Sequence, residues 1–384
     1  MLFFSSIPVI MYHHVNRHPE DSITISPEKF ESHIKFLKEQ GYTSLFLPEM
    51  FEIMYGRVKA PKKPVLMAFD DGYLDNWAYA FPILKKYKVK ATIFVITRLI
   101  RDAERTRTNM DDVWAGKIIE EGLPDIPPHL KTRQNSIITK EGLPDFLTWQ
   151  EMRVMEKSGL LDIQSHSHSH SAYFDSDKVL SFNDGTSTKL ASATDGDARL
   201  GIPVYKMAPA LVARRYFDDK DLRDHLAAYV EGNGGKRFFK SLNPNKELFA
   251  QANGYIGQNT LSDRFETEEE QAQRIKGELV VSKELIEKKL NKRCEYICWP
   301  WGSVDRKLKK TAREVGYKGG VGMRGGANFA LTNPFDIHRF NGCQKDMASF
   351  MQKLFKQSSL FLSLYNDDRI DALLMPKSRF KPEG

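Results

Sequence analysis

Short apolar runs alternate with amphipathic segments along most of the chain. Each apolar run is short enough for a buried strand, and each amphipathic segment repeats its hydrophobic residues at the spacing of one helix face. This alternation is typical of βαβ units around a parallel sheet or barrel. The predicted strands are 7–12, 42–47, 64–69, 91–97, 160–164, 296–299, 317–321 and 335–340, and the predicted helices include 27–40, 74–88 and 304–315.

Capping residues mark where several predicted helices begin and end. Ser26 and Pro27 suit an N-cap and a first helical residue, and Gly41 suits the end of the same helix. In segments 148–151 and 267–270, Thr stands three residues before Glu, which is the pattern of a capping box. We therefore expect further helices to begin at these two positions.

Two long stretches, 98–147 and 171–264, interrupt the alternation. The second is far longer than an ordinary loop, so it is predicted to be an insertion with its own structure, such as a lid or a substrate-selecting subdomain. Strand patterns resume after each stretch, which predicts one domain over residues 1–345 enlarged by two insertions. Residues 346–384 are a predicted helical extension and tail. Their amphipathic segment 350–365 could pack on the domain or rest on a membrane surface.

Composition excludes several classes of protein. The 384 residues are 41% hydrophobic and 28% charged, with 25 Gly and 18 Pro, so the chain is neither collagen-like, nor a coiled coil, nor wholly disordered. The net charge of +7 suits an anionic glycan or lipid partner, but the chain has no basic stripe or reading motif for nucleic acid. The three cysteines are an odd and small number, which favours free, buried thiols in a reducing compartment.

No apolar run approaches the ~18 residues that a membrane-spanning helix needs. The apolar start of the chain has no basic region and is broken by Ser5, Ser6 and Pro8, so it does not resemble a signal peptide. These features predict a cytoplasmic protein without a transmembrane segment. A location at the inner face of the membrane is compatible with this prediction.

Candidate chemistry follows directly on two predicted strands. Asp70 and Asp71 end the run 64–69, and His166, His168 and His170 come after the run 160–164. Two adjacent carboxylates at a strand end repel each other unless a cation is shared or one takes a proton, and histidine is a common metal ligand. The alternatives are a helix cap and turn for the aspartates, and a solvated loop or hydrogen-bonded core for the histidines. Spacing alone does not say which histidines bind.

A third polar segment follows the predicted strand 296–299. Trp299 and Trp301 flank Pro300, and Gly302 comes next. Tryptophans beside such a turn offer a stacking surface for a sugar ring, and exposed backbone N–H groups there could receive a developing oxyanion. The alternative is that the tryptophans belong to the core.

Together these segments resemble the polysaccharide deacetylase family, also known as NodB-homology or carbohydrate esterase family 4. Residues 68–72 (Ala-Phe-Asp-Asp-Gly), 165–170 (Ser-His-Ser-His-Ser-His) and 299–302 (Trp-Pro-Trp-Gly) are similar to the three family motifs, in the family's order. Residues 11–15 (Met-Tyr-His-His-Val) resemble the entry strand of the poly-N-acetylglucosamine deacetylase-like members. The resemblance covers about 7–99, 148–172 and 266–340.

The resemblance implies an α/β fold, a distorted (β/α)7 barrel with the two large insertions. It also implies one divalent metal ion, with zinc expected and cobalt, nickel or manganese as alternatives. The implied ligands are Asp71, His166 and His170, while His168 would point away from the ion.

The resemblance further implies Asp70 as the general base and the backbone N–H of Trp301 as an oxyanion donor. Trp299 and His13 are the other implied substrate-binding residues. The segment Asp336 to Arg339 is an approximate match to a late family motif with a catalytic histidine, which makes His338 the predicted general acid and His13 the second candidate. The alternative is the different strand that some relatives have at this place, in which case 337–340 is structural. The family's motif-three arginine has no counterpart beside Trp299, which leaves the orientation of Asp70 open.

The predicted function is a metal-dependent N-deacetylase acting on an N-acetylated sugar of a bacterial-type glycan, glycolipid or surface-polysaccharide precursor. The substrate is expected to be a carbohydrate. Because the net charge of the chain is positive, acidic and lipid-linked carbohydrates are among the expected substrates. The alternatives are an O-deacetylase or other amide hydrolase using the same site, and a non-catalytic glycan-binding protein on the same barrel.

Overall fold

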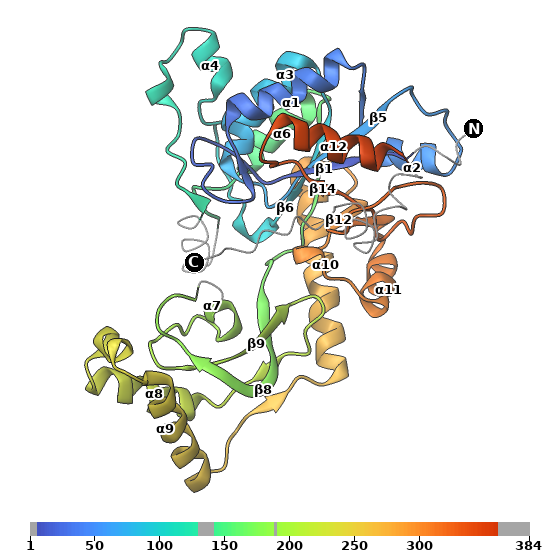
Figure 1. Cartoon of the computed structure of the whole chain (residues 1–384). Coiled ribbons are helices and arrows are strands. Elements are labelled where there is room, and N and C mark those ends of the chain that lie inside the picture. The colour runs from blue at the N-terminus through green and yellow to red at the C-terminus, as the bar shows by residue number, and fades with distance from the viewer. Residues whose placement is uncertain (1–5, 130–141, 188–189, 360–384) are drawn as a thin grey trace, which may run out of the picture.

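A curled sheet of parallel strands forms the centre of the larger lobe (Figure 1). The computed structural model describes residues 6–129, 142–187 and 190–359. Along the sheet the strand order is β13-β12-β7-β6-β5-β1-β14, and β4 pairs with β5 beside this path. The strands are β1 Val9–Tyr12, β4 Thr43–Leu45, β5 Pro64–Phe69, β6 Ala91–Val95, β7 Leu161–Ser165, β12 Tyr296–Cys298, β13 Gly319–Val321 and β14 Phe340–Asn341.

The two edges of this sheet come close to each other. Val321 in β13 makes an isolated parallel bridge to Ile337, three residues before β14 begins. The sheet is therefore an open, barrel-like α/β structure, which confirms the predicted fold class. Because all strands of the sheet run in parallel, their carboxyl ends gather on one side.

Capping residues fix the helices that cover the sheet. Ser26 accepts a hydrogen bond from the Lys29 N–H at the start of α1 (Pro27–Glu39), as predicted. Thr148 and Thr267 form the predicted capping boxes of α6 (Trp149–Lys157) and α10 (Glu268–Leu290). The other helices of this lobe include α2 Leu47–Met54, α3 Phe81–Tyr87, α4 Met110–Trp114, α11 Arg306–Val315 and α12 Met347–Ser358.

Two predicted elements differ in the structure. The predicted helix 74–88 contains a π-helical stretch, Asn76–Ala80, before α3, and Pro82 lacks the N–H that would continue an α-helical ladder at this point. The predicted strand 335–340 shrinks to Phe340–Asn341 because the chain crosses between the sheet edges here. Ile337 pairs with β13 and Phe340 pairs with β1.

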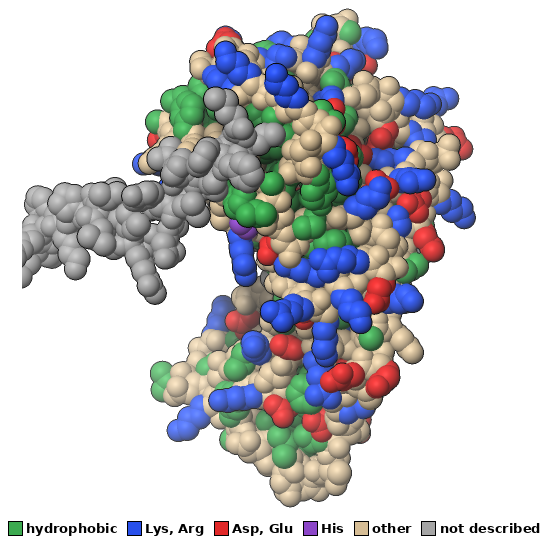
Figure 2. Space-filling model, turned by 90° about the vertical axis from the view of Figure 1, so that its right-hand side faces the viewer, with side chains coloured by type: hydrophobic (Ala, Val, Ile, Leu, Met, Phe, Trp, Pro, Cys, Tyr) green, Lys and Arg blue, Asp and Glu red, His purple; other side chains and the backbone are tan. Residues whose placement is uncertain are grey.

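The segment between β7 and α10 forms a second lobe with its own core (Figures 1 and 2). An antiparallel pair, β8 (Ala172–Phe182) and β9 (Pro203–Pro209), organises this lobe. Its remaining elements are α7 Leu190–Ala193, β10 Tyr216–Phe217, α8 Lys220–Gly232, α9 Pro244–Gln258 and β11 Arg264–Phe265. Helix α10 runs along both lobes (Figure 1), and Arg274 on it binds the carbonyl oxygens of Ala210 and Ala213.

Helix α12 packs on the barrel through its apolar face. Phe350 and Leu354 are fully buried, and the Phe350 ring stacks on His33 of α1 at 3.8 Å between ring centroids. For the part of 350–365 that the structure describes, packing is therefore observed; residues 360–365 lie outside the described ranges. No helix among the described residues is long and apolar enough to cross a bilayer.

His33 predicts a pH dependence of stability. Burial lowers its pKa from 6.5 to about 4, and the Tyr12 hydroxyl donates to its Nδ1 at 3.0 Å. Between these pH values the unfolded chain binds more protons than the folded one. The free energy of unfolding should therefore fall as pH drops from 6.5 to 4, by up to about 1.4 kcal/mol per pH unit from this group. Urea unfolding across this range measures the slope.

A matched pair of variants isolates the contribution of His33. His33→Gln removes the titrating group and should flatten the slope, whereas His18→Gln, at a more exposed loop position, should leave it unchanged. An unaltered slope in His33→Gln would show that other groups cause the pH dependence.

Candidate active site

The carboxyl ends of neighbouring strands meet in one cavity of about 1050 Å³. Asp70 and Asp71 follow β5, His166 and His170 follow β7, and Trp301 follows β12. All five line the cavity. Its volume lies at the upper end of the ~300–1,000 Å³ that is usual for ligand pockets.

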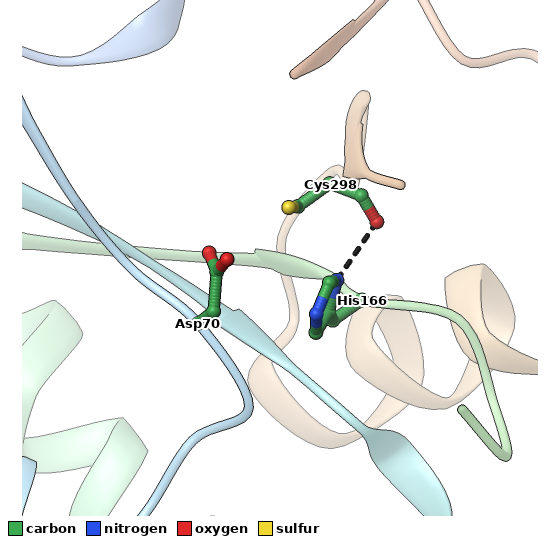
Figure 3. Close-up of side chains that lie close together, drawn as sticks. All are labelled: Asp70, His166 and Cys298. Carbon is green, nitrogen blue, oxygen red and sulfur yellow. Dashed lines mark hydrogen bonds between the residues drawn. The ribbon is translucent and has the colours of Figure 1, made fainter. Parts of the chain in front are cut away.

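Three ligand-type atoms converge at one point in this cavity. The Nε2 atom of His166 lies 3.3 Å from Asp71 Oδ1, and Nε2 of His170 lies 3.8 Å from the same oxygen. The His166 Nδ1–H donates to the carbonyl oxygen of Cys298 at 2.8 Å (Figure 3). Because that bond uses Nδ1, the Nε2 side of the ring faces the carboxylate.

The backbone that carries these atoms is held in an uncommon conformation. Asp71 has φ 71° and His170 has φ 50°, both in the left-handed region that side chains other than glycine rarely adopt. Gly72 also has positive φ, and a Cβ there would lie 2.8 Å from Val95 Cγ1. Such conformations persist where surrounding structure enforces them, and they are frequent at functional sites.

The donor atoms at this point suit a cation. Burial lowers the pKa of His170 to about 3, so its imidazole is neutral. Burial would raise the pKa of Asp71, but His166 and His170 outweigh it and hold that pKa well below the usual range. Asp71 Oδ1 is buried without a hydrogen-bond donor. Two imidazoles and an unsatisfied carboxylate therefore fit one divalent ion, a common donor set for zinc and its neighbours.

The loop that carries the histidines is fixed from helix α10. Glu278 accepts a hydrogen bond from the Ser169 N–H at 2.9 Å, and the hydroxyls of Ser282 and Ser165 are 2.7 Å apart. His168 lines the cavity but bonds Thr97 Oγ1 through its Nδ1 at 2.9 Å. His168 is therefore not part of the convergent trio, by which we mean Asp71, His166 and His170.

Asp70 is oriented by a buried arginine that the sequence reasoning missed. Nη1 and Nη2 of Arg339 donate to the two carboxylate oxygens of Asp70 at 2.7 and 2.6 Å, and Nη2 also lies 3.0 Å from Cys298 Sγ. Burial would raise the pKa of Asp70, but Arg339 and nearby imidazoles lower it below its usual value. The signal in the sequence was an arginine near the end of the predicted strand 335–340, directly before Phe340.

His13 lies on the other side of the Asp70 carboxylate. Its Nε2 is 3.7 Å from Asp70 Oδ2, and its Nδ1 is buried without a hydrogen-bond partner. Burial lowers the pKa of His13. The structure therefore brings His13 to the cavity beside the predicted base.

The structure separates the remaining predicted residues. Trp301 lines the cavity with its ring 4.2 Å from that of His170. Trp299 is instead fully buried in the core, where its Nε1–H donates to the Phe335 carbonyl oxygen, so the expected substrate contact is corrected. His338 also lies outside the cavity lining, because its ring turns toward the Ala327 carbonyl oxygen, and Arg339 takes the inward position.

Comparisons with known proteins agree with this architecture. Residues 57–200 match the polysaccharide deacetylase family model. YxkH of Bacillus subtilis, whose name describes it as a polysaccharide deacetylase, is 41% identical over 97 residues. These residues are 25% of this chain and 34% of YxkH. The poly-beta-1,6-N-acetyl-D-glucosamine N-deacetylase of Staphylococcus aureus is 31% identical over 147 residues, 38% of this chain and 37% of that protein.

A solved structure extends the likeness in fold. The de-N-acetylase from Aggregatibacter actinomycetemcomitans superposes with a TM-score of 0.56 at 18% identity, covering 91% of this chain and 99% of the other. Residues 57–200 of this chain are thus similar to the polysaccharide deacetylase family. The matched region spans about a third of the length of the curated relatives.

Proposed function

We propose that this chain is a metal-dependent N-deacetylase that removes acetate from an N-acetylated sugar of a glycan. The observation that carries the proposal is one cavity in which Asp71, His166 and His170 converge beside the ion pair of Asp70 and Arg339. A glycan-binding protein would not need a buried, oriented carboxylate next to a metal-type donor set. The activity for which the Staphylococcus aureus relative is named supports an N-acetylglucosamine polymer as the substrate class.

Asp71, His166 and His170 would hold the ion. When bound there, a divalent metal polarises a carbonyl oxygen and makes a nearby water molecule more acidic. The chain's own contribution is to keep the His170 imidazole neutral and the Asp71 carboxylate ionised, and to fix the His166 ring through the Cys298 carbonyl oxygen.

Asp70 would take the proton of the attacking water. Arg339 keeps this carboxylate ionised and holds both of its oxygens in place, which is the state that a general base requires. His13, 3.7 Å from Asp70, would pass a proton to the departing amine nitrogen in place of His338. The backbone N–H of Trp301 would donate to the oxyanion.

Acetate release tests this function. Wild type should release acetate from β-1,6-linked N-acetylglucosamine oligosaccharides, a chelator should abolish the release, and added zinc or cobalt should restore it. Release from O-acetylated but not N-acetylated sugars would assign an O-deacetylase. Binding of the oligosaccharide without any release would assign a non-catalytic glycan-binding protein.

A further inference from the structure

A second cluster of buried polar side chains lies beside the candidate active site. Asp75, His14 of β2 (His14–Val15) and His129 of the first insertion are joined by hydrogen bonds. Asp75 is 0% exposed and His14 is 1% exposed, so the cluster is cut off from solvent at its inner end. None of these residues belongs to the convergent trio or to the Asp70 pair.

Hydrogen bonds from three residues hold the carboxylate of Asp75. His14 Nδ1 is 2.5 Å from Asp75 Oδ2, Asn16 Nδ2 donates to the same oxygen at 2.8 Å, and Asn76 Nδ2 donates to Oδ1 at 3.0 Å. Since the two asparagine amides donate to both of its oxygens, the Asp75 carboxylate is an acceptor of hydrogen bonds. It therefore accepts from His14, and the Nδ1 of His14 carries the proton.

This order of bonds also sets the ring of His129. The Nδ1 side of His14 faces Asp75, and its Nε2 lies 3.1 Å from Nδ1 of His129. If the Nε2 of His14 accepts, the Nδ1 of His129 is the donor, which is the less common tautomer of histidine. Asp75, His14 and His129 form a relay in which each member orients the next.

The outer end of the relay is part of an aromatic wall of the cavity. Tyr73, His129 and Phe146 all line the cavity. The His14 ring stacks on Tyr73 at 3.6 Å between centroids, and the Tyr73 and Phe146 rings are 5.0 Å apart. Aromatic faces next to a fixed imidazole provide both stacking and hydrogen bonding, which are the two contacts that sugar rings use.

We propose that Tyr73, His129 and Phe146 form a subsite for the sugar unit adjacent to the one that is deacetylated, and that Asp75 and His14 act as positioning residues for His129. The inference rests on the proposed function for the identity of the ligand as a glycan. Tyr73 follows Asp71 by two residues, so this wall adjoins the reaction centre. The cavity of about 1050 Å³ leaves room beyond a single reacting sugar.

The relay itself is tested without any substrate. Nitrogen NMR of histidine-labelled protein should show His129 with its proton on Nδ1, and His14→Phe, which keeps the ring stacked on Tyr73, should shift this proton to Nε2. His129 with its proton on Nε2 in wild type, or an unchanged tautomer in His14→Phe, would overturn the relay.

The subsite is tested by binding in the Asp70→Asn background, which should prevent turnover. His129→Ala should lower the affinity for the β-1,6-linked N-acetylglucosamine pentamer about five- to tenfold, as expected for a lost hydrogen bond. The affinity for the monosaccharide should stay unchanged. His225→Ala, at an exposed position on α8, is the matched control and should change neither. Equal weakening of pentamer and monosaccharide, or no weakening, overturns the subsite. If the pentamer binds as expected in the Asp70→Asn background but the wild-type chain releases no acetate, only the proposed function is overturned.

Discussion

Replacing Asp70 with asparagine is expected to lower kcat for acetate release by about 10²- to 10⁴-fold, with KM changing much less. Asparagine keeps the size of the side chain but cannot accept a proton at the pH of the reaction. Both Asp70 oxygens accept from Arg339 in the wild type, so asparagine, whose amide NH2 cannot accept, loses one of these hydrogen bonds together with the basicity. Steady-state release of acetate from N-acetylglucosamine oligosaccharides measures the effect.

Arg339→Lys is the companion variant for the Asp70 prediction. Lysine keeps the positive charge but cannot make the two parallel hydrogen bonds of a guanidinium, so kcat should fall less than in Asp70→Asn. Urea unfolding of both variants separates a folding defect from a chemical one. Equal acetate release by Asp70→Asn and wild type would remove Asp70 from the role of base.

His170→Ala is expected to lose the metal ion and, with it, nearly all activity. The site then keeps only His166 and Asp71, and metal affinity should fall by more than the about 10- to 100-fold that loss of an outer hydrogen-bond partner costs. Elemental analysis after dialysis against limiting chelator measures the metal content directly. Acetate release by the same samples shows whether activity follows the metal.

His168→Ala provides the matched control for this prediction. His168 lies two residues before His170 on the same loop and lines the same cavity, but its ring bonds Thr97. Its removal should leave the metal content at the wild-type level. Loss of metal in His168→Ala, with retention in His170→Ala, would assign the ligands differently.

The local parts of the fold were predictable because local rules determine them. The apolar run 64–69 is a strand in the structure, the run 91–97 contains strand β6, and the capping boxes at Thr148 and Thr267 begin helices as expected. The site residues at strand ends were also predictable. Asp70, Asp71 and the histidines of 166–170 follow strands β5 and β7, and parallel strands place such residues on one side of the sheet.

The partner of Asp70 was not predictable from local pattern. Arg339 is separated from Asp70 by 269 positions along the chain, and only the strand order β5-β1-β14 of the sheet brings the start of β14 near the end of β5. The sequence pattern also does not determine which of two nearby side chains faces the cavity. His338 turns outward and Arg339 inward, while Trp299 is buried and Trp301 faces the cavity.

Helix α10 makes the second lobe and the candidate metal ligands mechanically dependent on each other. Arg274 on this helix anchors the lobe through Ala210 and Ala213, and one turn later Glu278 anchors the backbone beside His170. Since the helix is continuous between these anchors, a tilt imposed by the lobe is transmitted to the loop of His170. Sequence changes in the lobe that alter its seat on α10 should therefore affect metal retention as well as the shape of the cavity.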